Sequence, residues 1–546
     1  MTVLERRRTA VPARPPQRRV RAERPPFALP LLPALAVSAL SGGLYTLAFP
    51  APDVWILAFV GVGGMLAALR GRGFWSGVLT GFVGGLAFWF TLISWITLFL
   101  GAAPLIALGP FEALLMGLGG GLIALAYRSV PLLWRSRWGR VGITPLVVAA
   151  AWTCRETVAG TWPYGGFAWG RLALSQSTSP FAPLAAWFGL TGLSFVLAWA
   201  TALAVAALTE PRGPYARIDE RSRAGFLAPR LVAIAAVAAL LLVIPPFTPS
   251  EVGVLRISAV QPDTHAGFFD PRNDPAVNLQ AAVADSLHGI RSGTTQLVVW
   301  PEGASEDDPL ASDSTGAAIR GDLDTVAGIT GAPLLAGAIT ARDGRYYNSS
   351  LLWQGSLGLV GLYDKAHPVP FGEYVPDRAL WERFAPSLLG QITRGYTPGT
   401  RSPVLKVGSV PIGVDICFDI ADDGLMLGSV ADGAQVLVAQ TNNADFGHTE
   451  ENQQQLAIAR LRAIETGRAV VTVSTVASTT YIDPTGATLY AAPAFTPAVH
   501  TGAVPLADGL TPAVAFGIPL GATIALLGGA LPLVAGLLAR PLRRRR

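Results

Sequence analysis

Eight long apolar stretches limit most strongly what this chain can fold into. Of its 546 residues, 51% are hydrophobic and only 14% are charged, a balance typical of proteins that cross a membrane several times. A bilayer crossing needs about 20 apolar residues, and each stretch is that long or nearly so. The stretches cover residues 27–49, 54–69, 74–100, 104–127, 141–159, 184–208, 231–247 and 512–539.

The basic residues test the orientation independently. Residues 1–24 hold eight Arg against two Glu, and residues 540–546 hold five Arg. The other basic clusters, at residues 70–72, 128–140 and 212–230, fall in every second connection. Because cytoplasmic loops are enriched in Lys and Arg, this pattern predicts eight transmembrane helices with both termini in the cytoplasm. No basic stripe interleaved with aromatic residues occurs elsewhere, so we expect no nucleic-acid partner.

The orientation divides the chain into four parts. We expect a disordered Arg/Pro-rich cytoplasmic arm at 1–26, seven transmembrane helices at 27–249, an extracytoplasmic domain at 250–510, and the eighth helix with a basic tail at 511–546. β-Branched runs alternate with helical patterns in the external part, which predicts an α/β domain with a covered sheet core. Strands are expected at 254–260, 296–299, 334–338, 351–353, 360–363, 411–417, 436–439 and 470–474, and helices at 275–291, 315–329 and 449–467.

Three polar side chains follow strand-like runs in this domain: Glu302, Lys365 and Cys417. A carboxylate can take a thiol proton, an ammonium can stabilise an oxyanion, and a cysteine can attack a carbonyl carbon. Backbone N–H groups at a strand-to-helix turn would favour the thiolate form of Cys417. Taken singly, the three residues are equally typical of a salt-bridged Glu, a surface Lys and a buried structural Cys.

The remaining candidate ligands suggest neither a metal nor a disulfide. The five histidines are scattered without the spacing of metal ligands, so we expect no metal and no cofactor. The two cysteines are Cys154, in an apolar stretch, and Cys417, in the polar domain, and we do not expect them to pair.

These features together resemble a known family. Residues 250–510 resemble the nitrilase (carbon–nitrogen hydrolase) superfamily, whose Glu-Lys-Cys triad matches Glu302, Lys365 and Cys417 in order. The eight-helix frame with this domain before the last helix is similar to the membrane-embedded branch, the apolipoprotein N-acyltransferases. The matching words are Trp300-Pro-Glu302, Val369-Pro-Phe-Gly-Glu-Tyr-Val-Pro376, Ala459-Arg-Leu-Arg-Ala-Ile-Glu-Thr-Gly-Arg468 and Gly166-Phe-Ala-Trp169.

The resemblance implies an acyltransferase with an α-β-β-α sandwich domain. Cys417 would take an acyl chain from a membrane phospholipid as a thioester. The α-amino group of the diacylglyceryl-modified N-terminal cysteine of an apolipoprotein would then receive it. Glu373 would orient Lys365 or relay a proton, and the backbone N–H of Phe418 would complete the oxyanion site.

The resemblance also suggests further substrate or lid residues. These are Trp169, Trp381, Asp445 and Phe446, with Asp419 as a supporting residue beside the nucleophile. The apolar segment 380–389 suits a lid that dips into lipid, and equally a helix packed on the domain.

The chain departs from the family pattern at three places. It has Cys417-Phe418-Asp419 where Cys-Tyr-Glu is usual, Asp445 where Trp is usual, and Val476-Ala477-Ser478 in place of Asn-Asn-Gly. Two alternatives therefore stay open. One is a membrane-anchored nitrilase-type amidase that passes its acyl group to water. The other is a catalytically weak scaffold that holds a membrane glycosyltransferase. We expect the chain itself to be a monomer.

Overall fold

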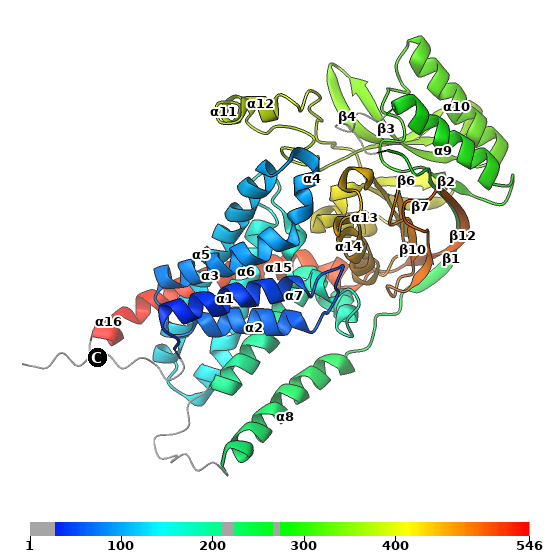
Figure 1. The fold of residues 1–546 in the computed structure, drawn as a ribbon. Helices are drawn as coiled ribbons and strands as arrows, with labels where there is room; N and C mark the ends of the chain where they lie inside the picture. The colour runs from blue at the N-terminus through cyan, green and yellow to red at the C-terminus, as the bar shows by residue number, and fades with distance from the viewer. Residues whose placement is uncertain (1–27, 210–221, 266–273, 545–546) are drawn as a thin grey trace, which may run out of the picture.

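The computed structural model describes residues 28–209, 222–265 and 274–544, which form a helical bundle and two β-sheets with their covering helices (Figure 1). A further helix, α8 (Ser222–Val243), lies along the outside of the bundle. The predicted arm at 1–26 and the basic stretch at 210–221 lie outside the described residues. The bundle helices are α1 (Leu31–Thr46), α2 (Leu57–Leu69), α3 (Phe74–Leu92), α5 (Ala103–Leu133), α6 (Thr144–Ala159), α7 (Ala185–Thr209) and α15 (Pro512–Leu538).

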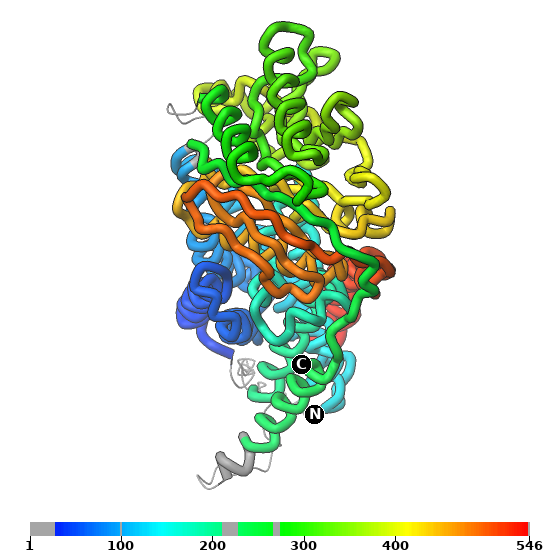
Figure 2. The backbone as a smooth tube through the Cα atoms, turned by 90° about the vertical axis from the view of Figure 1, so that its right-hand side faces the viewer, coloured from blue at the N-terminus to red at the C-terminus, as the bar shows by residue number. Residues whose placement is uncertain are grey.

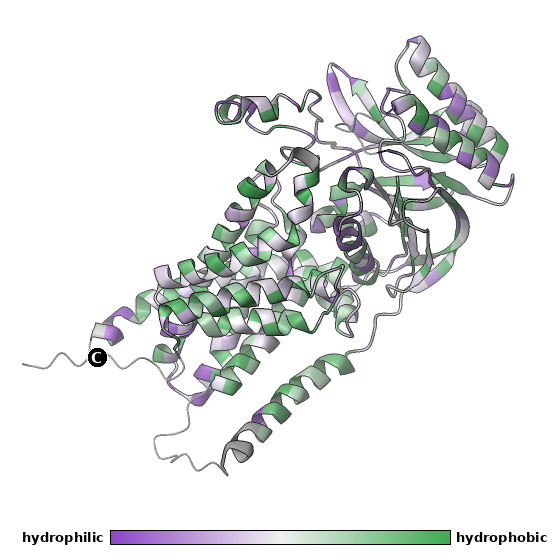
Figure 3. Ribbon diagram, in the orientation of Figure 1, coloured by the Kyte–Doolittle hydropathy of each residue, from purple (hydrophilic) through white to green (hydrophobic). Residues whose placement is uncertain are grey.

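The bundle has the surface of a membrane domain. Large apolar side chains point outward from it, and Leu32, Val243 and Leu526 are exposed over 74% or more of their area. Inside, glycines allow α3 and α5 to approach closely, since a Cβ atom on Gly77 would lie only 2.8 Å from the carbonyl oxygen of Gly120. Small residues at helix contacts and apolar residues outside are typical of helices in lipid. Figure 3 shows the same division, with apolar residues along the bundle and α8.

Four of the described helical segments are long and apolar enough to cross a membrane: α3, α5, α15 and residues 182–209, which contain α7. The helices α1 and α2 and the 228–243 part of α8 are apolar but shorter. Helix α6 carries Arg155 and Glu156, both of which are buried inside the bundle. Eight helices therefore stand at the eight predicted places, and the crossing of the bilayer by all eight stays a prediction.

Two of the predicted boundaries are wrong. Helix α5 continues to Leu133, so Arg128 lies within the helix, because the apolar residues resume after it. The stretch 74–100 breaks after α3, and a 3-10 turn (Ser94–Ile96) and the short α4 (Thr97–Leu100) follow. The break turns Trp95 toward the β-sheet part of the molecule, where its indole N–H donates to Gln454 Oε1 at 3.1 Å.

The β-sheet part is an α-β-β-α sandwich. The sheets have the strand orders β12-β1-β2-β3-β4-β5 and β11-β10-β9-β8-β7-β6, and apolar side chains of both meet between them. Helices α9 (Pro275–Gly289) and α10 (Ser314–Thr330) cover the first sheet, and α13 (Asp423–Ala431) and α14 (Glu451–Thr466) cover the second (Figure 1). The strands are β1 (Ser250–Gln261), β2 (Leu297–Val299), β3 (Leu334–Arg342), β4 (Arg345–Trp353), β5 (Leu359–Asp364), β6 (Val404–Val407), β7 (Val410–Ile416), β8 (Val436–Thr441), β9 (Val470–Ser474), β10 (Thr480–Ile482), β11 (Thr488–Ala491) and β12 (Ala498–Asp508).

All predicted strands and helices of this part are present, with shifted ends. The strands β6, β10, β11 and β12 were not predicted from the sequence. The largest omission is β12, which pairs antiparallel with β1 from Ser250 to Gln261 and lies beside it in Figure 2. Polar and apolar residues do not alternate clearly along β12. Most of its first half is only partly buried, so neither face of the strand needs to be strongly apolar.

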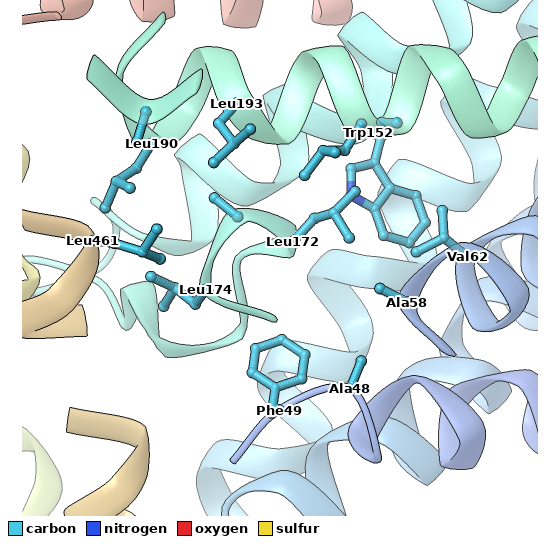
Figure 4. Close-up of a cluster of buried hydrophobic side chains, with 14 of the residues drawn as sticks. Ala48, Phe49, Ala58, Val62, Trp152, Leu172, Leu174, Leu190, Leu193 and Leu461 are labelled. Atoms are coloured by element: carbon cyan, nitrogen blue, oxygen red, sulfur yellow. The ribbon is translucent and has the colours of Figure 1, made fainter. Parts of the chain in front are cut away.

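The sandwich packs on the bundle through α14. Figure 4 shows Leu461 of α14 facing Leu174 and Leu190 from the bundle side, within one continuous apolar core. Two turns earlier, Gln454 Oε1 accepts hydrogen bonds from the indole N–H groups of Trp95 and Trp169, the latter at 2.7 Å. The helix that covers the second sheet is therefore also part of the bundle core.

A buried ion network strengthens the same junction. Arg462 of α14 pairs with Asp423 at 2.9 Å and with Glu465 at 2.6 Å. Arg171, from the bundle side, reaches Asp423 at 2.7 Å, and the backbone N–H of Leu190 donates to Glu465 at 2.8 Å. Burial acts to raise the pKa of Asp423, but the two guanidinium groups lower it to about 2.

Replacing Arg462 with methionine is expected to destabilise the protein by about 3–5 kcal/mol, because it leaves the buried Glu465 without its cation and Asp423 with Arg171 alone. Thermal unfolding in detergent micelles would measure the loss. Arg460→Met is the matched control, since Arg460 lies on the same helix and bonds only Thr488 near the surface, at 3.2 Å. Equal melting temperatures for the two variants would contradict a structural role for the network.

Candidate active site

Glu302, Lys365 and Glu373 form a buried charged cluster at the end of the first sheet. Glu302 follows β2 and Lys365 follows β5, so two strands of one sheet deliver them to the same edge. Lys365 Nζ lies 3.0 Å from Glu302 Oε1 and 2.9 Å from Glu373 Oε2. The Lys365 side chain is only 1% exposed, so both carboxylates interact with it where water screens little.

Asn348 of β4 holds the two acids in place. Its Nδ2 donates to Glu302 Oε1 at 2.7 Å and to Glu373 Oε1 at 3.0 Å. The backbone N–H of Val369 donates to the second oxygen of Glu373 at 2.6 Å. The acids are thus fixed from three directions, which is the preorganisation that acid–base chemistry requires.

The electrostatics of the cluster favour a carboxylate base beside a charged lysine. Burial raises the pKa of Glu302, and the ammonium of Lys365 offsets part of this rise. Burial acts to lower the pKa of Lys365, but Glu302 and Glu373 more than offset it, and that pKa is raised. Lys365 is therefore a permanent cation at neutral pH, and Glu302 is a stronger base than an ordinary glutamate.

Cys417 occupies a strained turn at the end of β7. Its φ is +53°, a left-handed backbone conformation that non-glycine residues rarely adopt. Such strain is concentrated at functional sites, where it fixes the direction of a side chain. The largest charge effects on the partly buried thiol come from Glu302 and Lys365.

The expectation that the turn favours a thiolate is wrong. Burial raises the pKa of the Cys417 thiol, Glu302 raises it further, and Lys365 offsets only part of the rise. The turn after β7 is a short 3-10 helix (Cys417–Ala421) rather than the start of an α-helix. The sulfur therefore rests as a thiol and needs a base to activate it.

The two residues after Cys417 belong to different surroundings. The ring of Phe418 stacks on Phe167 and Trp169 from the bundle side, with centroid distances of 6.2 and 6.3 Å. Asp419 is fully buried, and its carboxylate accepts hydrogen bonds from the Tyr363 hydroxyl at 2.7 Å and the His367 backbone N–H at 2.8 Å. An aromatic wall from the bundle thus reaches the residue beside Cys417.

Known proteins share this combination of bundle and sandwich. Residues 41–203 match the family described as apolipoprotein N-acyltransferase N-terminal domain, and residues 256–509 match carbon-nitrogen hydrolase. The chain is 32% identical over 527 residues to the apolipoprotein N-acyltransferase of Mycolicibacterium smegmatis, covering 91% of this chain and 84% of the relative. This chain belongs to the apolipoprotein N-acyltransferase family.

Other relatives in the family align over a similar length. The apolipoprotein N-acyltransferase of Azotobacter vinelandii is 30% identical over 519 residues, covering 91% of this chain and 95% of the relative. Among solved structures, an amidase from Nesterenkonia sp. aligns with 48% of this chain and 94% of its own, at 18% identity and a TM-score of 0.34.

Two further candidates lie on the bundle side of the site. Phe446 contacts Trp95 edge to face at a centroid distance of 5.1 Å, so it extends the aromatic wall. Asp445, where the family usually has Trp, accepts a hydrogen bond from Asn442 at 3.3 Å. Trp169 stacks on Phe418 and also donates a hydrogen bond to Gln454. It therefore contacts both the residue beside Cys417 and helix α14.

Trp381 lies on the predicted lid segment, away from the charged cluster. The segment forms two short helices, α11 (Arg378–Trp381) and α12 (Pro386–Leu389), which overhang the end of the bundle in Figure 1. The Trp381 indole N–H donates to the Tyr164 hydroxyl at 3.3 Å, and the Phe384 side chain is 75% exposed. An exposed phenylalanine above an apolar bundle suits a segment that contacts lipid. The alternative, one ordinary helix packed on the domain, does not describe this segment, because it forms two helices of four residues each.

The structure adds two polar residues that no sequence pattern indicated. Asn348 bridges the two acids, as described above, and Gln455 of α14 has its Nε2 atom 3.6 Å from the Cys417 sulfur. Asn443 Nδ2 donates to Gln455 Oε1 at 3.0 Å, which turns the amide nitrogen toward the sulfur. Both residues lie within ordinary strand and helix patterns, so only the assembled fold shows their place in this N-acyltransferase site.

Proposed function

We propose that this chain transfers an acyl chain from a membrane phospholipid, through a thioester on Cys417, to the α-amino group of the diacylglyceryl-modified N-terminal cysteine of an apolipoprotein. The observation that carries the proposal is the position of the charged cluster. Glu302 and Lys365 are in contact and both act electrostatically on the strained Cys417, whose neighbour Phe418 stacks on aromatic rings of the bundle side. The family membership supports the same reaction.

The first half-reaction forms the thioester. Glu302 takes the thiol proton, and the sulfur attacks the ester carbonyl carbon of the phospholipid. The Lys365 ammonium and the backbone N–H of Phe418 stabilise the oxyanion. The carbon–oxygen bond to glycerol then breaks, and Glu302 returns the proton to the leaving oxygen, which releases a lysophospholipid.

The second half-reaction makes the amide. The amine nitrogen of the acceptor attacks the thioester carbonyl carbon, and the carbon–sulfur bond breaks. A thioester is reactive enough toward an amine, so no further energy source is needed. Glu373 and Asn348 hold Glu302 and Lys365 in position through both steps.

The bundle explains why the substrates are lipids. Moving an acyl chain from the bilayer into water costs about 0.8 kcal/mol per CH₂ group, so a site beside the membrane avoids that cost. The aromatic wall of Phe167, Trp169 and Phe418 offers an apolar surface between lipid and nucleophile. We place the protein in the bacterial cell membrane, with the sandwich on the outer side and both termini in the cytoplasm.

Neither alternative gains support from the molecule. An amidase needs only an anchor, whereas this sandwich shares a continuous core with the whole bundle. A scaffold for a glycosyltransferase would not need a buried Lys365 held between two acids.

The intact mass of the purified protein after incubation with phospholipid tests the proposal. We expect one added acyl chain on the Cys417 peptide, which hydroxylamine removes because a thioester is sensitive to it. A diacylglyceryl-cysteinyl peptide should then discharge the enzyme and gain the same mass as an amide. Discharge at the same rate without the peptide would indicate water as the acceptor and would contradict the proposal.

A further inference from the structure

A cavity of about 220 Å³ lies at the junction of the two parts, next to the residue after the nucleophile. Its walls come from the loop after α6, from the segment after Lys365 and from the turn after Cys417. Phe418 and Ala366 line it, and they directly follow Cys417 and Lys365 in the chain. The mechanism above leaves this cavity without a role.

His367 and Asp422 are the charged side chains in the cavity wall. His367 is 39% exposed and Asp422 is 38% exposed, and the His367 Nε2 atom lies 3.9 Å from Asp422 Oδ2. Behind them, Asp419 is fully buried, with its Oδ1 atom 3.4 Å from His367 Nδ1. The rest of the wall is formed by Pro, Gly, Ala and aromatic residues.

Two carboxylates face this histidine, so the cavity suits a cation. Asp422 lines the cavity and Asp419 lies behind it, so two carboxylates stand against one imidazole, while the Lys365 ammonium, which also interacts with Asp419, is held by Glu302 and Glu373. The wall also holds the hydroxyls of Tyr164 and Tyr374: burial raises the pKa of Tyr374, and the Tyr164 hydroxyl donates to Asp377 at 2.8 Å. Apolar walls around a net negative charge fit a primary ammonium group attached to an apolar body.

We propose that this cavity receives the free α-ammonium group of the diacylglyceryl-modified N-terminal cysteine of the acceptor. His367 removes the proton that this ammonium must lose before its nitrogen attacks the thioester. The inference rests on the proposed function, because it concerns the second half-reaction of the same site. It adds a base that the Glu302 mechanism lacks, since Glu302 handles only one of the two protons that the ammonium nitrogen loses.

The proton balance shows why two bases are needed. An ammonium carries no lone pair, so one proton passes first to His367 Nε2. The neutral nitrogen then forms the C–N bond as the C–S bond breaks, and its second proton passes through Glu302 to the departing sulfur. Each turnover releases one proton net, and the partly exposed His367 can return it to water.

The pH dependence follows from the same contacts. The carboxylate of Asp419, 3.4 Å from Nδ1, raises the pKa of His367, burial acts against it, and Asp422 raises it further. His367 accepts a proton only when it is neutral. The transfer rate should therefore rise with pH through a value above 6.5, the ordinary pKa of this side chain.

Single-turnover transfer by the full-length protein in phospholipid bilayers tests the inference. The enzyme is first loaded with its acyl chain and then mixed with a diacylglyceryl-cysteinyl peptide at several pH values. For His367→Gln we expect transfer at neutral pH to fall about 100-fold, and to fall far more than thioester formation. The deficit should narrow above about pH 8, where the α-amino group of the peptide loses its proton unaided.

His288→Gln is the matched control, since His288 lies exposed on α9 and bonds only the carbonyl oxygen of Ala284. A second variant, Asp422→Asn, retains an oxygen for the hydrogen bond from Leu425 N that caps α13 but removes the charge. It should raise the KM for the peptide more than it lowers kcat.

The outcomes separate the two proposals. A deficit of His367→Gln that is equal at every pH, or no deficit at all, would overturn the role of His367. An unchanged KM in Asp422→Asn would overturn the ammonium site. Failure of the unmodified protein to form a thioester would instead refute the proposed function, together with the inference that depends on it.

Discussion

The Cys417→Ala protein is expected to form no thioester and to transfer acyl chains at least about 10⁴-fold more slowly than the unmodified protein. The proposed reaction passes through a covalent bond to this sulfur, and no second thiol lies near the charged cluster in the described part of the chain. The cysteines are Cys154 and Cys417, both free, and Cys154 lies in α6 of the bundle. The rate of N-acylation of a lipoprotein in a strain that lacks the activity would measure the loss.

Cys154→Ala is the matched control for this experiment. Cys154 packs against Gly528 and Gly529 of α15, so its replacement removes one sulfur from a helix contact and leaves the charged cluster intact. We expect this variant to restore N-acylation. Restoration by Cys417→Ala as well would rule out the covalent mechanism.

The Lys365→Met protein is expected to lose both activity and stability. Without the ammonium, Glu302 and Glu373 remain buried with Asn348 as a shared hydrogen-bond donor. Burial would then raise the pKa of Glu302 further, so that it holds a proton at neutral pH and cannot accept one from Cys417. We expect a loss of at least about 10³-fold in thioester formation and of about 3–5 kcal/mol in the free energy of unfolding.

Thioester mass and thermal unfolding, both measured in detergent, check the two parts of this expectation. The sequence holds two lysines, and the other, Lys406, is exposed on β6, which makes Lys406→Met a matched control. A Lys365→Met protein that melts lower yet forms the thioester at the normal rate would assign Lys365 to stability alone.

The sequence predicts most of the fold because its patterns are long. Apolar stretches of membrane length, and basic residues in every second connection, can be recognised from local composition alone. The runs that became β7, β8 and β9 are rich in β-branched residues and are buried on both faces, so their pattern is unambiguous. Strand β11 is mostly exposed, so its sequence lacks the apolar pattern of a buried strand. It is held as a strand by its pairing with β10, which local sequence does not reveal.

The positions of the candidate site residues were predictable where each residue follows a strand. Glu302, Lys365 and Cys417 follow β2, β5 and β7, and the structure brings Glu302 and Lys365 into direct contact. Asn348 could not be predicted, since it points from the middle of β4 to an acid 46 positions away. The thiolate expectation was wrong because the burial of Cys417, which raises its pKa, depends on the assembled tertiary structure.

Helix α14 also limits how this protein can be divided. Its neighbouring residues Gln454 and Gln455 touch bundle tryptophans and the nucleophile sulfur, respectively. Neither half is therefore an independent module, and a sandwich released from its bundle would expose the apolar face around Leu461 to water. Recombination between relatives should yield active chimaeras only when α14 and the bundle loops bearing Trp95 and Trp169 are inherited from the same parent.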